Sequence, residues 1–199
     1  MIADLNPYAE YKDAELAWLE RLPTHWALRR IKSLFVERSE KNHAGEPLLA
    51  ATQSKGVVRK EDYGSRTVTA VNGLENLKLV QVGDFVISLR SFQGGIETSY
   101  ARGIISPAYT VLSPREDTDS DYFRHLFKSA EFINSLTLCI TGIREGQNVD
   151  YERLSRAFMP LPHPSEQSAI VRFLDWATGR LERAIRAKRK VIALLGEQK

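Results

Sequence analysis

This 199-residue chain has only one cysteine, Cys139. A lone cysteine excludes an intramolecular disulfide and any CxxC metal site. No apolar run approaches the roughly 18 residues that a membrane-spanning helix needs, and no basic stretch precedes an apolar one at the N-terminus, so we expect neither a span nor a secretory signal. The composition, 43% hydrophobic and 27% charged, is typical of a soluble globular protein. The simplest expectation is a cytoplasmic protein without membrane contact.

Catalytic motifs are also missing. The sequence contains no GxSxG elbow, no GxxxxGK[ST] phosphate loop and no GxGxxG after a strand. The four histidines have no HxH or HExxH spacing that would form a metal site; they are His25, His43, His125 and His163. Asp84 and Glu97 bracket a predicted strand as nuclease carboxylates can, but no lysine follows in an ExK arrangement, and structural roles are favoured. We therefore predict no catalytic residue and no metal site in this chain.

Charge is distributed unevenly along the chain. Residues 1–20 carry a balance of −4, whereas residues 166–199 carry +4. The segment between them is mildly basic and could contact nucleic acid or be an ordinary surface. Charge alone leaves both interpretations open.

The pattern of apolar residues predicts an α+β fold. Residues 1–22 are interpreted as a polar lead-in, and residues 24–35 as a short helix capped by Thr24. Strands are predicted where the period is close to two, with Gly, Asn and Pro between them, at residues 47–52, 56–58, 67–69, 77–82, 84–90 and 109–112. They would form a mixed or antiparallel sheet, curled toward a barrel.

Helical patterns dominate the second half of the chain. Asp119 and Ser120 open a predicted helix whose apolar face continues to Leu136, a Gly-rich loop follows at 141–148, and residues 151–158 form a short amphipathic stretch. Prolines at 160, 162 and 164 then end the preceding structure, and Ser165 is placed to cap a long helix with Glu166 in its first turn.

The last helix carries a heptad pattern. Six of the eight seam positions are apolar, and these are the predicted helix-pairing residues: Val171, Leu174, Leu181, Ile185, Ile192 and Leu195. Thr178 and Lys188 occupy the other two. Such a seam predicts a partner helix, from a second copy or another protein; the alternative is a helix folded back on its own domain. Gly179 weakens the helix by about 1 kcal/mol relative to Ala.

Polar residues suited to DNA recur at the ends of the predicted strands. Arg can bind guanine bidentately and Gln adenine, and glycines let the backbone approach closely. Loops from one sheet could converge on a groove. The candidate DNA-binding residues are Gln53, Ser54, Lys55, Arg59, Lys60, Arg66, Arg90, Ser91, Gln93, Gly94, Tyr100, Arg102, Arg144, Gln147 and Asn148.

Several motifs, taken in order, resemble the specificity subunits of type I restriction–modification enzymes. They are Leu22-Pro23-Thr24-His25-Trp26, Leu48-Leu49-Ala50-Ala51-Thr52-Gln53, Val82-Gly83-Asp84-Phe85-Val86-Ile87-Ser88-Leu89-Arg90 with Gly94-Gly95-Ile96, Gly103-Ile104-Ile105-Ser106-Pro107-Ala108-Tyr109, and Pro160-Leu161-Pro162 with Glu166-Gln167 and Phe173-Leu174-Asp175. The last series, leading into a long helix, is the most specific of them.

The resemblance implies a target recognition domain at 1–160, including the lead-in, and a spacer or dimerisation helix at 165–199. It implies a non-catalytic chain that reads one half of a bipartite site in double-stranded DNA. Its partners would be methyltransferase subunits that use S-adenosylmethionine, and translocase–nuclease subunits that use ATP and Mg²⁺. With one recognition domain and one helix, the chain corresponds to half a subunit, as a natural short form or a fragment. Two copies paired as a homodimer through a coiled coil would read a palindrome with a spacer.

Two other functions stay open from the sequence. The chain could be an assembly or decoy subunit that only docks partners through its basic helix. It could also be a nuclease or methyltransferase in its own right, which the missing motifs disfavour.

Overall fold

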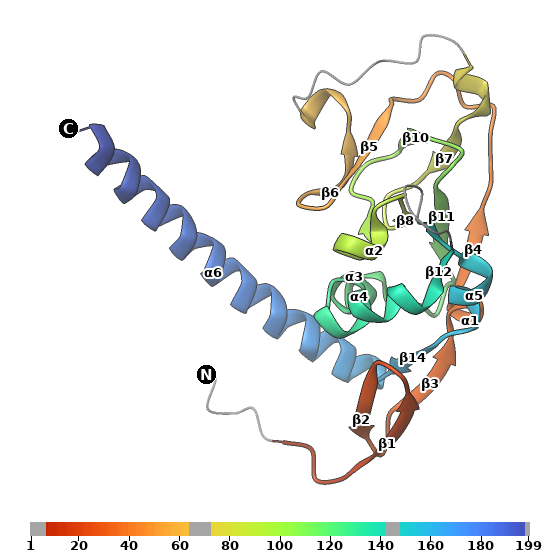
Figure 1. Cartoon of the computed structure of the whole chain (residues 1–199), viewed down its shortest axis with the longest axis vertical. Helices are drawn as coiled ribbons and strands as arrows, with labels where there is room; N and C mark the ends of the chain where they lie inside the picture. Colours follow the sequence, from red (N-terminus) through yellow and green to blue (C-terminus); the bar gives the residue numbers. More distant parts are fainter. Residues whose placement is uncertain (1–6, 64–72, 142–147, 198–199) are drawn as a thin grey trace. The chain divides into compact units, whose positions relative to one another are not determined.

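The computed structural model describes residues 7–63, 73–141 and 148–197. The chain divides into two compact units, Met1–Pro162 and His163–Lys199 (Figure 1). The first is a mixture of short strands and helices, and the second consists of one helix. The predicted α+β class with a long C-terminal helix is confirmed.

The predicted polar lead-in is wrong. Strands β1 (Tyr11–Leu16) and β2 (Leu19–Pro23) pair antiparallel as a hairpin, and Tyr11 lies opposite Pro23. Ala14 of β1 and Leu22 of β2 are buried. The charged residues of both strands are exposed, and only a few apolar side chains are buried. This composition resembles that of a surface loop, which is why the sequence pattern does not predict the strands.

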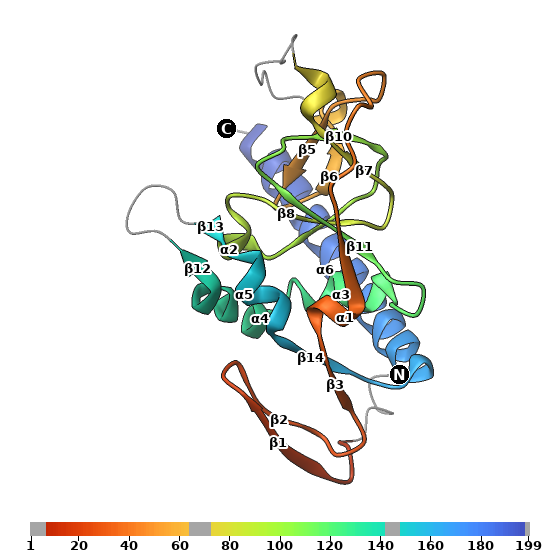
Figure 2. The same ribbon diagram turned by 90° about the vertical axis from the view of Figure 1, so that its right-hand side faces the viewer.

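The predicted helix at 24–35 is also wrong in most of its length. Strand β3 (Ala27–Arg30) is followed by one helical turn, α1 (Ile31–Leu34), and then by strand β4 (Phe35–Arg38). The reason is a distant partner, since β3 pairs antiparallel with β14 (Phe158–Leu161), and the two strands lie side by side in Figures 1 and 2. Pairing across such a separation overrides local helical spacing.

The largest sheet has the strand order β4-β11-β8-β9 and is antiparallel throughout. Its members besides β4 are β8 (Phe85–Ile87), β9 (Glu97–Thr98) and β11 (Thr110–Pro114). Val86 and Val111 lie opposite each other and are fully buried. The strands predicted at 84–90 and 109–112 are therefore present, the first of them shorter than expected.

Two further antiparallel pairs curl around the same core. Strand β5 (Leu49–Thr52) pairs with β6 (Gly56–Arg59), and β7 (Lys78–Val80) pairs with β10 (Gly103–Ile105). Isolated parallel bridges, Leu48 to Ile104 and Val57 to Ser99, link the pairs to their neighbours. The strands thus curl as predicted without closing into a barrel. The strand predicted at 67–69 lies outside the described residues.

The core inside these strands is aliphatic, whereas the core beneath the helices is aromatic. Leu49, Val57, Val80, Val86, Ile105 and Val111 form the aliphatic cluster. Phe127 contacts the rings of Phe35, Phe85, Phe123 and Phe132 at centroid distances of 4.9–5.6 Å. Edge-to-face and tilted ring pairs of this kind add to the burial energy. They fix the helices against the sheet.

The helix predicted from 119 to 136 is two helices. Helix α3 (Ser120–Leu126) is capped by the Asp119 carboxylate, and α4 (Ala130–Leu136) by the hydroxyl of Ser129, which accepts a hydrogen bond from the Phe132 amide. Because serine is a strong N-cap, the helix restarts there in a new direction. The turn between the two helices contains Lys128.

The remaining elements of the first unit are short. They are the 3₁₀ turns Glu61–Tyr63, Leu74–Asn76 and Thr137–Cys139, helix α2 (Ser91–Gly94), strands β12 (Ile140–Thr141) and β13 (Asn148–Val149), and helix α5 (Tyr151–Arg156). Most of the Gly-rich loop predicted at 141–148 lies outside the described residues.

The second unit is helix α6 (Pro164–Glu197), whose 34 residues make it about 51 Å long. Its cap differs from the prediction. The carbonyl of His163 accepts from the amides of Glu166 and Gln167, so His163 occupies the cap position. Pro164 takes the first helical position, which favours proline because no donor is needed there. Ser165 lies inside the helix, with its hydroxyl 2.9 Å from His163 Nδ1.

Candidate nucleic-acid interface

The loop between β5 and β6 is a tight turn that presents Gln53, Ser54 and Lys55 to solvent. The Thr52 hydroxyl donates to the Gly56 carbonyl at 2.9 Å and accepts from the Lys55 amide at 3.0 Å. Gly56 has a φ of 70°, and a Cβ there would lie 2.5 Å from the Thr98 carbonyl oxygen. Glycine is therefore required for this turn. The three polar side chains are displayed on a fixed backbone.

A second loop joins β8 to α2 and carries Arg90. The Ser88 amide donates to the Ser91 hydroxyl at 2.8 Å, and the Ser91 amide donates to the Ser88 carbonyl at 3.1 Å. Ser91 is 1% exposed, so its hydroxyl holds the loop instead of facing a ligand as predicted. Arg90 and Gln93 remain exposed. Among the described residues no acid forms an ion pair with Arg90.

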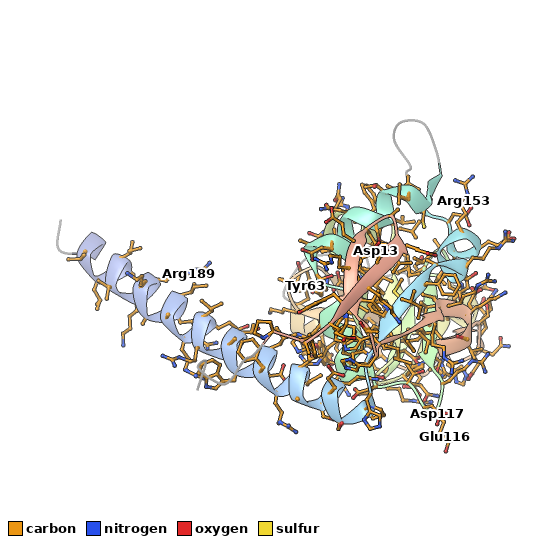
Figure 3. All side chains as sticks on the ribbon, turned by 90° about the horizontal axis from the view of Figure 1, so that it is seen from below. Asp13, Tyr63, Glu116, Asp117, Arg153 and Arg189 are labelled. Atoms are coloured by element: carbon orange, nitrogen blue, oxygen red, sulfur yellow. The ribbon has the colours of Figure 1, made fainter. Side chains whose placement is uncertain are left out.

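The two loops meet at one pocket of about 570 Å³. Gln53 and Ser54 line it from the first loop, and Arg90 lines it from the second, so three of the predicted residues converge. Its other lining residues are Ala51, Thr52, Tyr63, Ser88, Leu89, Glu97 and Tyr109. The Lys55 ammonium lies 5.9 Å from the centre of the Tyr63 ring (Tyr63 is labelled in Figure 3). A polar recess with aromatic walls and a cation at its rim suits the edge of a nucleic acid base.

Helix α2 contacts the first loop directly. A Cβ added to Gly94 would lie 2.8 Å from the Gln53 side chain, closer than any real contact. Gln53 therefore packs onto the bare backbone of Gly94. The Gln53 side chain thus lies against the last residue of α2.

An ion pair between the buried Glu97 and the partly exposed Lys128 lies under this contact. The Lys128 ammonium donates to Glu97 Oε1 and to the Gly94 carbonyl, both at 2.7 Å. Glu97 is 2% exposed, and its Oε2 has no hydrogen-bond partner among the described residues. Burial raises the pKa of the Glu97 carboxyl, and the bonds from Lys128 oppose this only in part. Glu97 was considered from the sequence as a nuclease carboxylate, but the structure pairs it with a lysine.

The other predicted residues lie in different places. Arg59 lies 3.6 Å from Glu61, and Arg102 lies 2.8 Å from Glu46, both away from the turn of the β5–β6 hairpin. Lys60 is half-buried and follows β6, where its amide donates to the Leu48 carbonyl.

Two of the predicted residues lie nearer the loops. Tyr100 is exposed and its ring covers Gly56. Asn148 belongs to β13, which lies against α2 (Figure 2). Arg66, Arg144 and Gln147 lie outside the described residues.

Sequence reasoning missed four residues of this site, namely Tyr63, Ser88, Tyr109 and Lys128. Tyr63 and Tyr109 come from a 3₁₀ turn and a turn before β11, where no local pattern indicates a shared pocket. Lys128 lies 31 positions from Glu97. Only the fold brings the two together.

Asp84, the other carboxylate considered from the sequence, has a structural role. It is 2% exposed and accepts from the Arg38 guanidinium at 3.0 Å and from the Gln81 amide at 2.8 Å. Within the described part of the chain, no group of three or more His, Cys, Asp or Glu residues is arranged to hold a metal ion.

The seam of α6 is exposed over its second half. Leu181, Ile185, Ile192 and Leu195 all present most or half of their side-chain surface to solvent. Val171 and Leu174 lie nearer the start of the helix. Side chains radiate all round the part of α6 that bears Arg189 (Figure 3). Over the described residues, no helix is long and apolar enough to cross a membrane.

Comparison with known proteins gives a match in structure only. No family model and no curated protein matches the sequence. The HsdS subunit from Thermoanaerobacter tengcongensis superimposes with a TM-score of 0.57 at 20% identity, over 89% of this chain and 42% of that one. A chain from a structure on the complex assembly and conformational transition of the type I R-M system gives a TM-score of 0.62 at 17% identity, over 94% and 46%.

The fold is similar to that of part of an HsdS subunit. This agrees with the resemblance found in the sequence motifs. The chain spans less than half the length of either HsdS-like neighbour. At this identity the likeness to HsdS establishes the fold, and the function is argued from the site.

Proposed function

We propose that this chain is a DNA-reading module of a type I restriction–modification complex. The first unit would read one half of a bipartite site in double-stranded DNA. Helix α6 would set the spacing to the other half and dock methyltransferase subunits. In this scheme the chain itself is non-catalytic, and S-adenosylmethionine, ATP and Mg²⁺ would act in the methyltransferase and translocase–nuclease partners.

The observation that carries the proposal is the convergence of Gln53, Ser54 and Arg90 on one pocket. These residues come from two loops far apart in the sequence, on a fold similar to HsdS. Arginine and glutamine make the bidentate contacts that distinguish guanine and adenine in the major groove, each worth about 1–3 kcal/mol of discrimination. The hydrogen bond from the Ser88 amide to the Ser91 hydroxyl and the positive φ of Gly56 define the backbone paths of the two loops.

The exposed seam of α6 supports a partner helix. An amphipathic helix is stabilised mainly by burying its apolar face, and the seam residues from Leu181 onward are exposed in the single chain. Two copies paired along this seam would form a homodimer with two-fold symmetry and would read a palindrome with a spacer. A coiled coil with a helix of another subunit would give an asymmetric site.

The test is to assemble the chain with methyltransferase subunits and map the methylated positions in exposed DNA. Methylation confined to one split sequence is expected, and a palindromic split sequence would indicate the homodimer. The Arg90→Ala complex should assemble but methylate a broader set of sequences. Methylation that ignores sequence in the wild-type complex would refute DNA reading and favour an assembly or decoy subunit.

A further inference from the structure

The ion pair of Lys128 and Glu97 lies beneath the two loops. Glu97 is 2% exposed and lines the pocket, whereas the Lys128 side chain is 33% exposed and lies outside its lining. Burying charges is costly in most positions, and a well-packed apolar pair of similar volume is often as stable. Glutamate is rarely buried, and Oε2 of Glu97 has no hydrogen-bond partner among the described residues. A buried glutamate that is only partly satisfied by one lysine therefore points to a role other than stability.

The contacts of Lys128 show what the pair holds. Its ammonium bridges Glu97 Oε1 on β9 and the Gly94 carbonyl at the end of α2, at 2.7 Å each. The bond to Gly94 satisfies a carbonyl at the helix end, where no helical donor is available. Lys128 thus ties α2 to β9 from the turn between α3 and α4.

A close backbone approach completes this attachment. Gly95 has a φ of 79°, and a Cβ there would lie 2.2 Å from the Phe127 carbonyl oxygen. The end of α2 therefore abuts the turn that carries Lys128. The preceding residue, Gly94, contacts the Gln53 side chain. Lys128 thus contacts Gly94, and Gly94 contacts Gln53. Arg90 immediately precedes α2.

We propose that Lys128 and Glu97 are positioning residues that set which base edges Gln53 and Arg90 can reach. The inference rests on the proposed DNA-reading function. A shift of α2 by a fraction of an ångström moves Gln53 and Arg90 together, and bidentate base contacts tolerate little misplacement. The specificity of the chain then depends on two residues that need not touch DNA.

The experiment uses the full chain assembled with methyltransferase subunits and a pool of duplex DNA with a randomised stretch. Retained duplexes are sequenced, and the preferred base at each position is compared between variants. Lys128→Met removes the bridge and leaves Glu97 buried without its cation. The double variant Lys128→Met with Glu97→Gln removes both charges, so it should fold close to wild type while α2 still loses its tie.

The matched control is Arg38→Met, which removes the cation from the other buried carboxylate, Asp84. That pair lies at the opposite end of β8 from the Arg90 loop. Both single variants should unfold at lower temperature than wild type. Only the variants at Lys128 should lose base preference, by about tenfold or more at the positions read by Gln53 and Arg90.

The outcomes separate the inference from the function on which it rests. A wild-type complex without base preference would overturn both. A wild-type preference that the double variant keeps would overturn the positioning role alone. Equal loss of preference in the double variant and in Arg38→Met would also overturn it, because general destabilisation would then be sufficient. Loss in the double variant with preference retained in Arg38→Met supports it.

Discussion

Replacing Ile192 with alanine tests the proposed pairing of α6. Alanine lacks three side-chain carbons of isoleucine, and burying each contributes about 0.8 kcal/mol. Ile192 is 69% exposed in the single chain, so its burial in a dimer would contribute about 1.6 kcal/mol per helix. Two symmetric copies double this to about 3 kcal/mol, and we expect the dimer dissociation constant to rise about 100-fold.

Leu194→Ala is the matched control, because Leu194 is 51% exposed on the same helical turn but lies off the seam. We expect it to change the dissociation constant by less than about threefold. Sedimentation equilibrium measures both variants, and circular dichroism checks that the helix content is retained. An equal rise of the dimer dissociation constant in the two variants would refute pairing along the seam. A wild-type chain that stays monomeric at high concentration would refute it as well.

Arg90→Ala should broaden the set of DNA sequences that are bound. Lys55→Ala should lower the affinity for all sequences alike and reduce the slope of log affinity against log salt concentration by about one. Titrations of matched and scrambled duplexes at several salt concentrations measure both effects. Gly56→Ala should destabilise the fold by about 2 kcal/mol or more in urea unfolding because of its positive φ and the nearby Thr98 carbonyl, while Gly45→Ala, with open space around it, should cost little. Burial raises the pKa of Glu97 in the folded chain above its usual 4.5. The protonated Glu97 therefore contributes most to the stability of the fold below pH 4.5, and this contribution is lost as the pH rises through the raised pKa. The melting temperature of wild type minus that of Glu97→Gln should therefore be larger at about pH 4 than at about pH 7. A difference that does not change with pH would contradict this.

Patterns with a local cause could be predicted from the sequence. The heptad repeat predicts α6, and the period-two segments predict β5, β8 and β11, because each depends on one face of a single element being apolar. Their start and end points were less accurate. The sequence predicts Ser165 as the cap, whereas His163 takes that position and the helix begins two residues earlier, at Pro164.

Features with a distant cause could not be predicted. Strand β3 forms because β14 pairs with it, and the helical spacing of its apolar residues carries no trace of that partner. The same holds at the site. Loop residues such as Arg90 and Gln53 were identified by residue type, but the contact of Gln53 with Gly94 and the bridge from Lys128 depend on tertiary packing.

The pairing of β3 with β14 has a consequence for how such a domain can be exchanged. Ala27 lies opposite Leu161, so the chain enters and leaves the body of the domain at the same place. Segments whose ends adjoin are tolerated as insertions, because the host needs only to bridge a short gap. The stretch between these strands is therefore suited to exchange for a homologous one. Under the proposed DNA-reading function, such an exchange would change the bound sequence while the junction to α6 stays unchanged.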